Sequence, residues 1–145
     1  MEGNMNADIL GLFFGTYNTA TGQAQPQTEL TIKKEDLDRS SEIFVGRYIW
    51  QNTTGYTIAL ECQVTIDGVP AQYYGGSNVV SGQAGQVDVP LFRWPGTAKA
   101  NALGKHTIVV TPGLHKGVMG GQETFEVSLP KTFWFPQKTF TVNLV

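Results

Sequence analysis

Apolar and polar side chains alternate with a period of two along much of this chain, and this alternation limits its fold more than any other feature. In residues 56–66, one set of alternate positions is apolar and the other is mostly polar. Successive side chains of a β-strand point to opposite faces of a sheet, so the apolar set is expected to face a core. The same period recurs in residues 87–91, 124–129 and 139–144. The predicted core positions are Ile58, Leu60, Cys62, Val64, Ile66, Val87, Val89, Leu91, Phe125, Val127, Leu129, Phe140, Val142 and Leu144.

Turn residues separate these stretches, and the segments that could form helices are short. Asp67 and Gly68 fit a tight hairpin turn, and residues 52–55 fit a reversal between two long strands. Only residues 34–39 and 97–103 suit a helical turn, whereas a parallel sheet needs crossover connections of about a dozen residues. We therefore predict eight or nine strands that form an all-β, immunoglobulin-like antiparallel β-sandwich with extra C-terminal strands.

The length of 145 residues predicts one domain over residues 1–145, because domains commonly contain about 100–200 residues. Residues 1–27 are expected to supply an N-terminal strand and then an extended segment able to reach a neighbouring subunit. The glycine-rich residues 111–122 are expected to form a long loop. Residues 69–74 are expected to form a strand that pairs with the preceding one.

Charge and composition exclude several classes of partner. Charged residues make up 15% of the chain, against about 25% in an ordinary soluble domain. The net charge of −2 argues against a basic surface that binds the phosphates of nucleic acid. No stretch approaches the roughly 18 consecutive apolar residues of a membrane-spanning helix. Residues 1–6 show neither a basic nor an apolar segment, so we expect no secretory signal and synthesis in the cytoplasm.

The residues that usually carry catalysis are sparse and do not form recognisable motifs. His106 is expected at the edge of a strand and His115 in a solvated loop, and neither is near a nucleophile in sequence. No cluster of His and Cys has the spacing of metal ligands, and Asp36 and Asp38 fit a solvated turn better than a calcium loop. Cys62 is expected to be a small buried apolar side chain. We therefore predict a protein that is not an enzyme and needs no cofactor or metal.

Aromatic residues are the best candidates for a functional surface. Residues 133–135 are three consecutive aromatics, which cannot all face one core in a strand. Residues 43–50 are apolar on both faces, so one face is expected to be covered by another element or another chain. Trp, Tyr and Phe are enriched in subunit interfaces, although the same residues could instead close the ends of the sandwich. The predicted interface residues are Phe44, Tyr48, Trp50, Phe133, Trp134 and Phe135, and the candidate ligand-binding residues are Tyr73, Tyr74 and Trp94.

The middle of the chain resembles the cell-adhesion-related domain found in bacteria (CARDB), an immunoglobulin-like module. The resemblance rests on the order of strands and turns in residues 48–55, 64–68, 81–85 and 104–110, and it covers about residues 40–111. The C-terminal part of the chain adds strands beyond that pattern. The resemblance implies an interaction module with no catalytic residues to carry over.

Taken with the neutral surface and the aromatic candidates, these features favour a non-enzymatic structural protein of a multi-subunit assembly. The expected setting is a phage or virus particle, as a capsid decoration or tail protein located in the virion, with further copies or other subunits as partners. An alternative is a carbohydrate-binding or adhesive module at the extracellular surface, in which Trp94, Trp134 or Tyr73 would line a groove for a glycan. A third hypothesis, a small hydrolase, requires a cleft where a histidine meets a carboxylate and a nucleophile.

Overall fold

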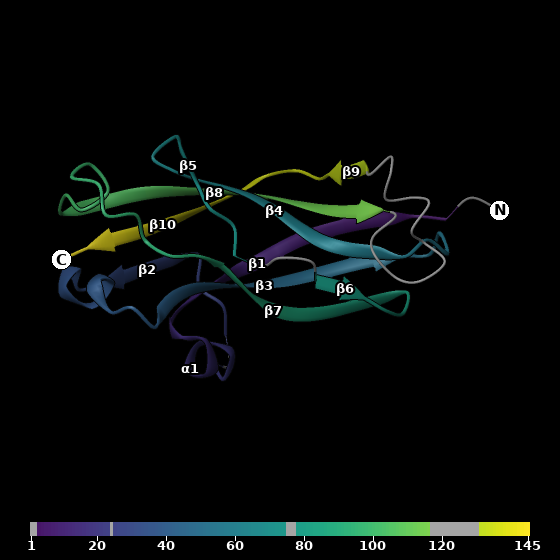
Figure 1. Ribbon diagram of the computed structural model, residues 1–145, viewed down its shortest axis with the longest axis horizontal. Helices are drawn as coiled ribbons and strands as arrows, with labels where there is room; N and C mark the ends of the chain where they lie inside the picture. Colours follow the sequence, from purple (N-terminus) through teal and green to yellow (C-terminus); the bar gives the residue numbers. More distant parts are fainter. Residues whose placement is uncertain (1–2, 24, 75–77, 117–130) are drawn as a thin grey trace.

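The protein is built from two β-sheets that pack face to face, as the computed structural model shows for residues 3–23, 25–74, 78–116 and 131–145 (Figure 1). The first sheet (sheet A) is antiparallel and has the order β1-β3-β7. The second (sheet B) has the order β2-β10-β8-β4-β5, with β6 also paired to β4 and β9 to β8. The expected all-β, sandwich-like fold is confirmed, although β2 and β10 pair in parallel. The strands are β1 (Met5–Thr16), β2 (Glu29–Ile32), β3 (Glu42–Asn52), β4 (Ile58–Ile66), β5 (Val69–Ala71), β6 (Asn78–Val80), β7 (Ala84–Phe92), β8 (Gly104–Lys116), β9 (Lys131–Trp134) and β10 (Lys138–Leu144).

The core lies between the two sheets and follows the predicted alternation closely. All five predicted core residues of β4 are buried, as are the three of β10. Two positions differ from the prediction: Ala59, on the other face of β4, is buried, and Val87 is exposed on β7. The predicted core residues in 124–129 lie outside the described residues, so the alternation is tested only in the other strands.

The predicted interface residues Phe44 and Tyr48 belong to this core, and that assignment is corrected. Both side chains are fully buried between the sheets of the same chain. The Phe44 ring stacks on Phe92 with its centroid 4.6 Å away. The opposite face of β3 is covered as well, because Ile43 and Val45 form a small cluster with residues of β1 and α1 (Tyr17–Thr21). The chain itself therefore covers both faces of β3 at residues 43–45, whereas Ile49 and Trp50 are only partly buried.

Helix α1 was not predicted, because five residues are too few to show a helical period. It begins where the Thr16 hydroxyl accepts a hydrogen bond from the Thr19 N–H at 3.3 Å, which satisfies one of the free donors of the first turn. Its buried residue, Ala20, packs on the outer face of sheet A. The residues expected to extend toward a neighbour thus fold back in part on their own sheet. The second short helix, a 3₁₀ helix over Lys34–Asp38, lies where a helical turn was expected.

Strand β8 continues through residues 111–113, which were expected to begin a loop. Proline normally interrupts a sheet because it has no N–H to donate. Here Pro112 lies after Val110, the last described residue of β8 paired with β10, and before Gly113, the first paired with β9. Pro112 is also paired with Cys62 of β4, but its carbonyl accepts from the N–H of Phe135 at 2.9 Å, so its backbone polar groups point away from β4 and toward the gap between the β10 and β9 pairings. Residues 117–122 of the predicted loop lie outside the described residues, and the strand expected over 69–74 ends at Ala71.

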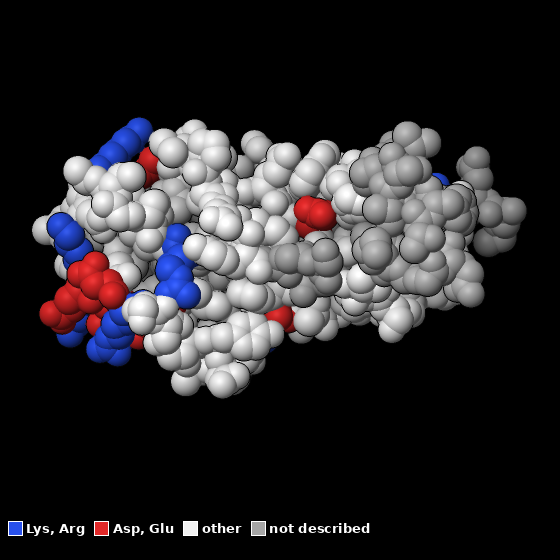
Figure 2. Space-filling view, in the orientation of Figure 1, with Lys and Arg blue, Asp and Glu red and all other residues white. Residues whose placement is uncertain are grey.

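The predicted turns are present and connect the strands as expected. Asp67 and Gly68 both have positive φ values, 51° and 82°, as a two-residue hairpin turn between β4 and β5 requires. Residues 52–55 reverse the chain between β3 and β4, which places consecutive strands in different sheets. In the view of Figure 2, charged side chains gather at the end of the molecule where the C-terminus lies. Among the described residues, no helix is both long and apolar enough to cross a membrane.

Candidate functional site

A hollow of about 370 Å³ lies at the end of the molecule opposite the C-terminus, and aromatic side chains line much of it. We call it the aromatic hollow. The predicted contact segment 133–135 and the N-terminal residues, distant in sequence, converge here. Trp134 is 43% exposed and Tyr56 is 49% exposed, which is unusual for side chains of this size. The lining residues are Gly3, Met5, Thr54, Tyr56, Lys116, Phe133, Trp134 and Phe135.

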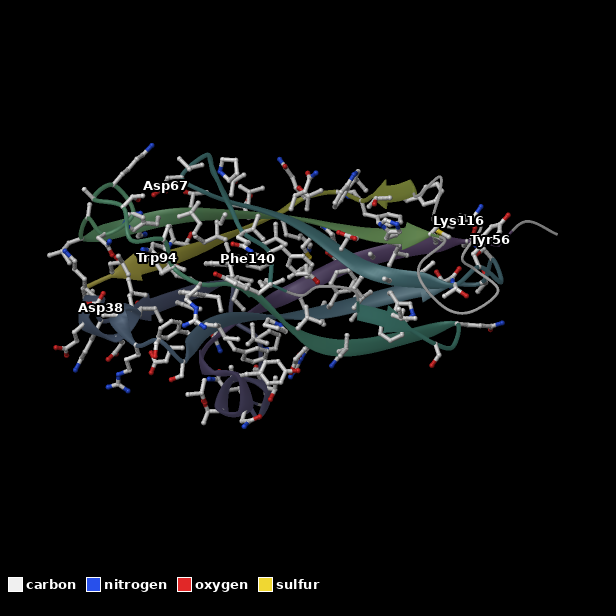
Figure 3. The ribbon with its side chains drawn as sticks, viewed as in Figure 1. Asp38, Tyr56, Asp67, Trp94, Lys116 and Phe140 are labelled. Carbon is white, nitrogen blue, oxygen red and sulfur yellow. The ribbon has the colours of Figure 1, made fainter. Side chains whose placement is uncertain are left out.

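Hydrogen bonds fix the segments that form this hollow. The N–H of Asn4 donates to the hydroxyl of Thr53 at 2.8 Å, and the carbonyl of Asn4 accepts from the N–H of Thr53 at 2.9 Å. The buried Asn52 amide donates to the Tyr56 carbonyl at 2.8 Å, which holds the turn before β4. Lys116, at the end of β8, places its Nζ 3.6 Å from the centre of the Tyr56 ring. Figure 3 shows these last two side chains together at this end of the molecule.

The candidate ligand-binding residues are not gathered into one groove. Trp94 is buried, and its indole N–H donates to the Ala100 carbonyl at 2.9 Å, so its assignment as an exposed ligand platform is corrected. Tyr74 is exposed, whereas Tyr73 is half-buried and packs against the core. Trp50, a predicted interface residue, is also half-buried and packs against the core. For these last three residues, the predicted roles stay predictions.

His106, which was expected at the edge of a strand, lies near the start of β8, is buried and forms a pair with Asp67. Its Nδ1 lies 2.5 Å from a carboxylate oxygen of Asp67, and its Nε2 lies 2.6 Å from the Ala102 carbonyl. A carbonyl oxygen and a carboxylate are hydrogen-bond acceptors, so this geometry favours a proton on both ring nitrogens, which is the imidazolium form. We call this arrangement the His106 pair.

The pKa values of the pair agree with that geometry. Burial alone would lower the pKa of His106, but the hydrogen bonds to Ala102 and Asp67 outweigh it and raise the pKa above 6.5. Burial alone would raise the pKa of Asp67, but hydrogen bonds from His106 and from the Thr107 N–H lower it below 3.8. The charged forms of both side chains are therefore favoured, as expected for an ion pair that is also hydrogen-bonded.

His115 lies on β8, not in a loop, and forms a second pair with Glu61 of β4. Its Nδ1 is 3.2 Å from Glu61 Oε1 and 3.3 Å from the hydroxyl of Thr132. The two side chains are 23% and 34% exposed, so the pair is open to solvent. His115 Nε2 forms no hydrogen bond or ion pair in the described part of the chain, since both polar contacts of the ring are at Nδ1. We call this arrangement the His115 pair.

Neither pair has the geometry of a nucleophile, base and acid in series. Such a relay needs the nucleophile and the acid on opposite ring nitrogens. In the His115 pair, Thr132 and Glu61 approach the same nitrogen. In the His106 pair, the second nitrogen faces a carbonyl group. The hollow beside Asp67 is also small, about 40 Å³.

The described side chains offer neither a cluster of metal ligands nor an exposed thiol. Within residues 3–23, 25–74, 78–116 and 131–145, no three side chains of His, Cys, Asp or Glu are placed to hold a metal ion. Cys62 is buried, and burial raises the pKa of its thiol far above the ordinary value, which disfavours the reactive thiolate.

Comparisons of this chain with protein-family models, with curated proteins and with solved structures find no match. The function is therefore inferred from the geometry of the described residues. Sequence reasoning singled out the segment 133–135 but missed Tyr56, Lys116, Glu61 and His115. Their proximity is created by the pairing of β4, β8 and β9, and no local sequence pattern marks it.

Proposed function

We propose that the protein is a non-enzymatic subunit of a multi-subunit assembly and that the aromatic hollow is its contact surface. The observation that carries this proposal is the convergence of the N-terminal residues, Tyr56 and residues 133–135 on one hollow. Trp and Tyr commonly contribute most of the binding energy when a partner covers them. An exposed Trp and an exposed Tyr in the same hollow are therefore the surface on this protein best suited to a partner.

The chemistry of the hollow indicates what a partner segment would present. Among the described residues, Lys116, stacked on Tyr56, is the only charged side chain that lines it. A partner would insert an apolar or aromatic side chain and place an acceptor near the ammonium group of Lys116. Desolvation by the partner would strengthen the attraction between Lys116 and the face of the Tyr56 ring.

A phage or virus particle, with the protein as a capsid decoration or tail protein in the virion, stays the proposed setting. The low charge of the surface supports close packing of repeated copies, because few charges would lose their water at each contact. Membership of the CARDB family and a place at the extracellular surface also stay predictions.

The proposal is tested by the mass of the protein in solution as a function of concentration, measured by analytical ultracentrifugation. We expect reversible self-association, weakened at least about tenfold by Trp134→Ala or Tyr56→Ala, because truncated central aromatics commonly cost 2 kcal/mol or more. Leu103→Ala, at an apolar residue that is more exposed than either aromatic, is the matched control and should leave association unchanged.

The unfolding free energy of each variant separates a contact role from a core role. Loss of association with little change in stability supports the proposal. A wild-type protein that stays monomeric at every concentration contradicts self-assembly through the hollow. A Trp134→Ala variant that loses as much stability as a core truncation contradicts the contact role of Trp134.

A further inference from the structure

The outer face of sheet B carries a second group of side chains beside the aromatic hollow. Trp134 belongs to both groups, and the other members do not line the hollow. In the pairing of β4, β8 and β9, Glu61 lies opposite Gly113, and Gly113 lies opposite Trp134. One step along the same face, His115 lies opposite Thr132. We call this group, Trp134, Glu61, His115 and Thr132, the Trp134 platform.

Gly113 provides the seat for the indole ring. A Cβ atom on Gly113 would lie 2.6 Å from Cε3 of Trp134 and 2.8 Å from Cζ3, closer than carbon atoms approach one another. The indole ring therefore rests directly on the backbone of β8, in the space that a side chain at Gly113 would fill. Gly113 lies between Trp134 and Glu61 in the sheet. Because Trp134 is also 43% exposed, part of the ring surface remains open to solvent.

Polar atoms border this open ring and are held in place. The contact between Glu61 Oε1 and His115 Nδ1 orients both side chains. Within the described ranges, Glu61 Oε2, His115 Nε2 and the indole nitrogen of Trp134 form no hydrogen bond or ion pair, whereas Glu61 Oε1 and His115 Nδ1 contact each other. The platform thus offers one carboxylate acceptor, one imidazole nitrogen and one indole donor beside an apolar ring.

From this geometry we infer that the Trp134 platform binds a neutral saccharide. The carbon-bound hydrogens on one face of a sugar ring would pack on the indole, and hydroxyl groups at the rim would bond Glu61 and His115. A sugar hydroxyl both donates and accepts, so it suits either form of the imidazole. The carboxylate of Glu61 favours an uncharged sugar over an anionic one. This inference shares Trp134 with the proposed assembly, but it also rests on Glu61 and His115, which do not line the aromatic hollow.

Binding is tested by calorimetric titration with soluble hexaoses of glucose and of N-acetylglucosamine. A parallel arm measures retention on the corresponding insoluble polysaccharides, which separates recognition of free sugar from recognition of a polymer surface. We expect binding of at least one of these four probes. Glu61→Ala should weaken it about tenfold, as expected for a lost hydrogen bond to a charged group. Trp134→Ala should weaken it by at least about as much, because the stacking surface is lost.

Gln63→Ala is the matched control, because Gln63 is an exposed residue on the same face of β4, two positions from Glu61. It should bind like the wild type. Tyr56→Ala removes part of the aromatic hollow but no member of the platform, so it should weaken association and leave saccharide binding unchanged. Glu61→Ala should do the reverse, which makes failures of the two proposals distinguishable.

Three results would overturn the inference. One is the absence of binding to all four probes. Another is binding that Glu61→Ala and Trp134→Ala leave unchanged in variants whose unfolding shows that they are folded. The third is an equal effect of Gln63→Ala and Glu61→Ala, which would show that the contact is not specific to the platform. Loss of association in Glu61→Ala would assign the platform to a protein partner instead.

Discussion

The protein contains two pairs of an imidazole and a carboxylate, and they differ in how many nitrogens of the imidazole ring have a hydrogen-bond partner. In the His106 pair, both ring nitrogens have acceptors and the ring is buried. In the His115 pair, the carboxylate and a hydroxyl share one nitrogen and the side chains are partly exposed. The same functional groups are thus fully hydrogen-bonded in the buried His106 pair, which we call the closed region. In the partly exposed His115 pair, the open region, one ring nitrogen is left for a hydrogen bond.

The tryptophan beside each pair shows the same contrast. Trp94 is buried, places its ring edge-on to His106 with centroids 5.4 Å apart, and donates its N–H to a carbonyl. Trp134 is partly exposed and rests on a glycine. The buried tryptophan has its polar atom bonded inside the protein, whereas part of the other ring faces the solvent.

The largest expected effect comes from Asp67→Asn, which removes the charge of the His106 pair but keeps a residue that tolerates the positive φ of the hairpin turn. We expect the unfolding free energy to fall by about 2–3 kcal/mol, because a buried imidazolium loses its charged acceptor. Urea unfolding measures this change. A loss below about 0.5 kcal/mol would place this pair among the weak surface ion pairs.

Trp94→Phe tests the closed region without altering a charge. The indole N–H loses its bond to the Ala100 carbonyl and a small cavity remains, so we expect a loss of about 1–2 kcal/mol in unfolding free energy. Unfolding monitored by circular dichroism measures it. Trp134→Phe is the control for the open region and should change stability by less.

The pH dependence of stability provides a third test. The pKa of His106 is raised in the folded state, so its contribution is fully present below about 6.5 and is lost as pH rises through the higher folded-state value. The pKa of Asp67 is lowered, so its contribution is lost as pH falls below 3.8 toward the folded-state value. Each unit of separation between folded and unfolded pKa contributes about 1.4 kcal/mol.

Unfolding measured from about pH 5 to pH 9 should show the alkaline loss in the wild type. The loss should be smaller in Asp67→Asn, because removal of the carboxylate lowers the pKa of His106 toward its ordinary value. Nitrogen chemical shifts of the His106 ring should report protonation at both nitrogens up to a higher pH than in an ordinary histidine, because the pKa of His106 is raised. A ring that loses its proton at the pH of an ordinary histidine would contradict the two-acceptor geometry.

The smallest expected effect is that of Glu61→Gln, the counterpart of Asp67→Asn in the open pair. A partly exposed ion pair contributes little, so we expect a change of less than about 0.5 kcal/mol in unfolding free energy. The same urea titration measures both variants. Equal losses in the two would remove the distinction between a closed and an open pair.

The sequence predicted the strands and the hairpin at Asp67 well, because alternation and turn preference are local properties. It did not predict that one face of β3 packs in the main core and the other against β1 and α1, because both faces are apolar in the sequence. It also placed His115 wrongly and did not predict the partner of His106. Their environments depend on residues 39 and 54 positions away, and only the pairing of strands brings these residues together.

The hydroxyl of Tyr48, on the inner side of β3, donates a hydrogen bond to the carbonyl of Gly113. Gly113 is also the residue on which the Trp134 ring rests at the outer surface. A single strand of backbone thus separates a phenol anchored in the opposite sheet from an indole that meets the solvent. A shift of one sheet relative to the other would therefore move the indole. The rigidity of the core thus limits the motion of the Trp134 ring at the surface.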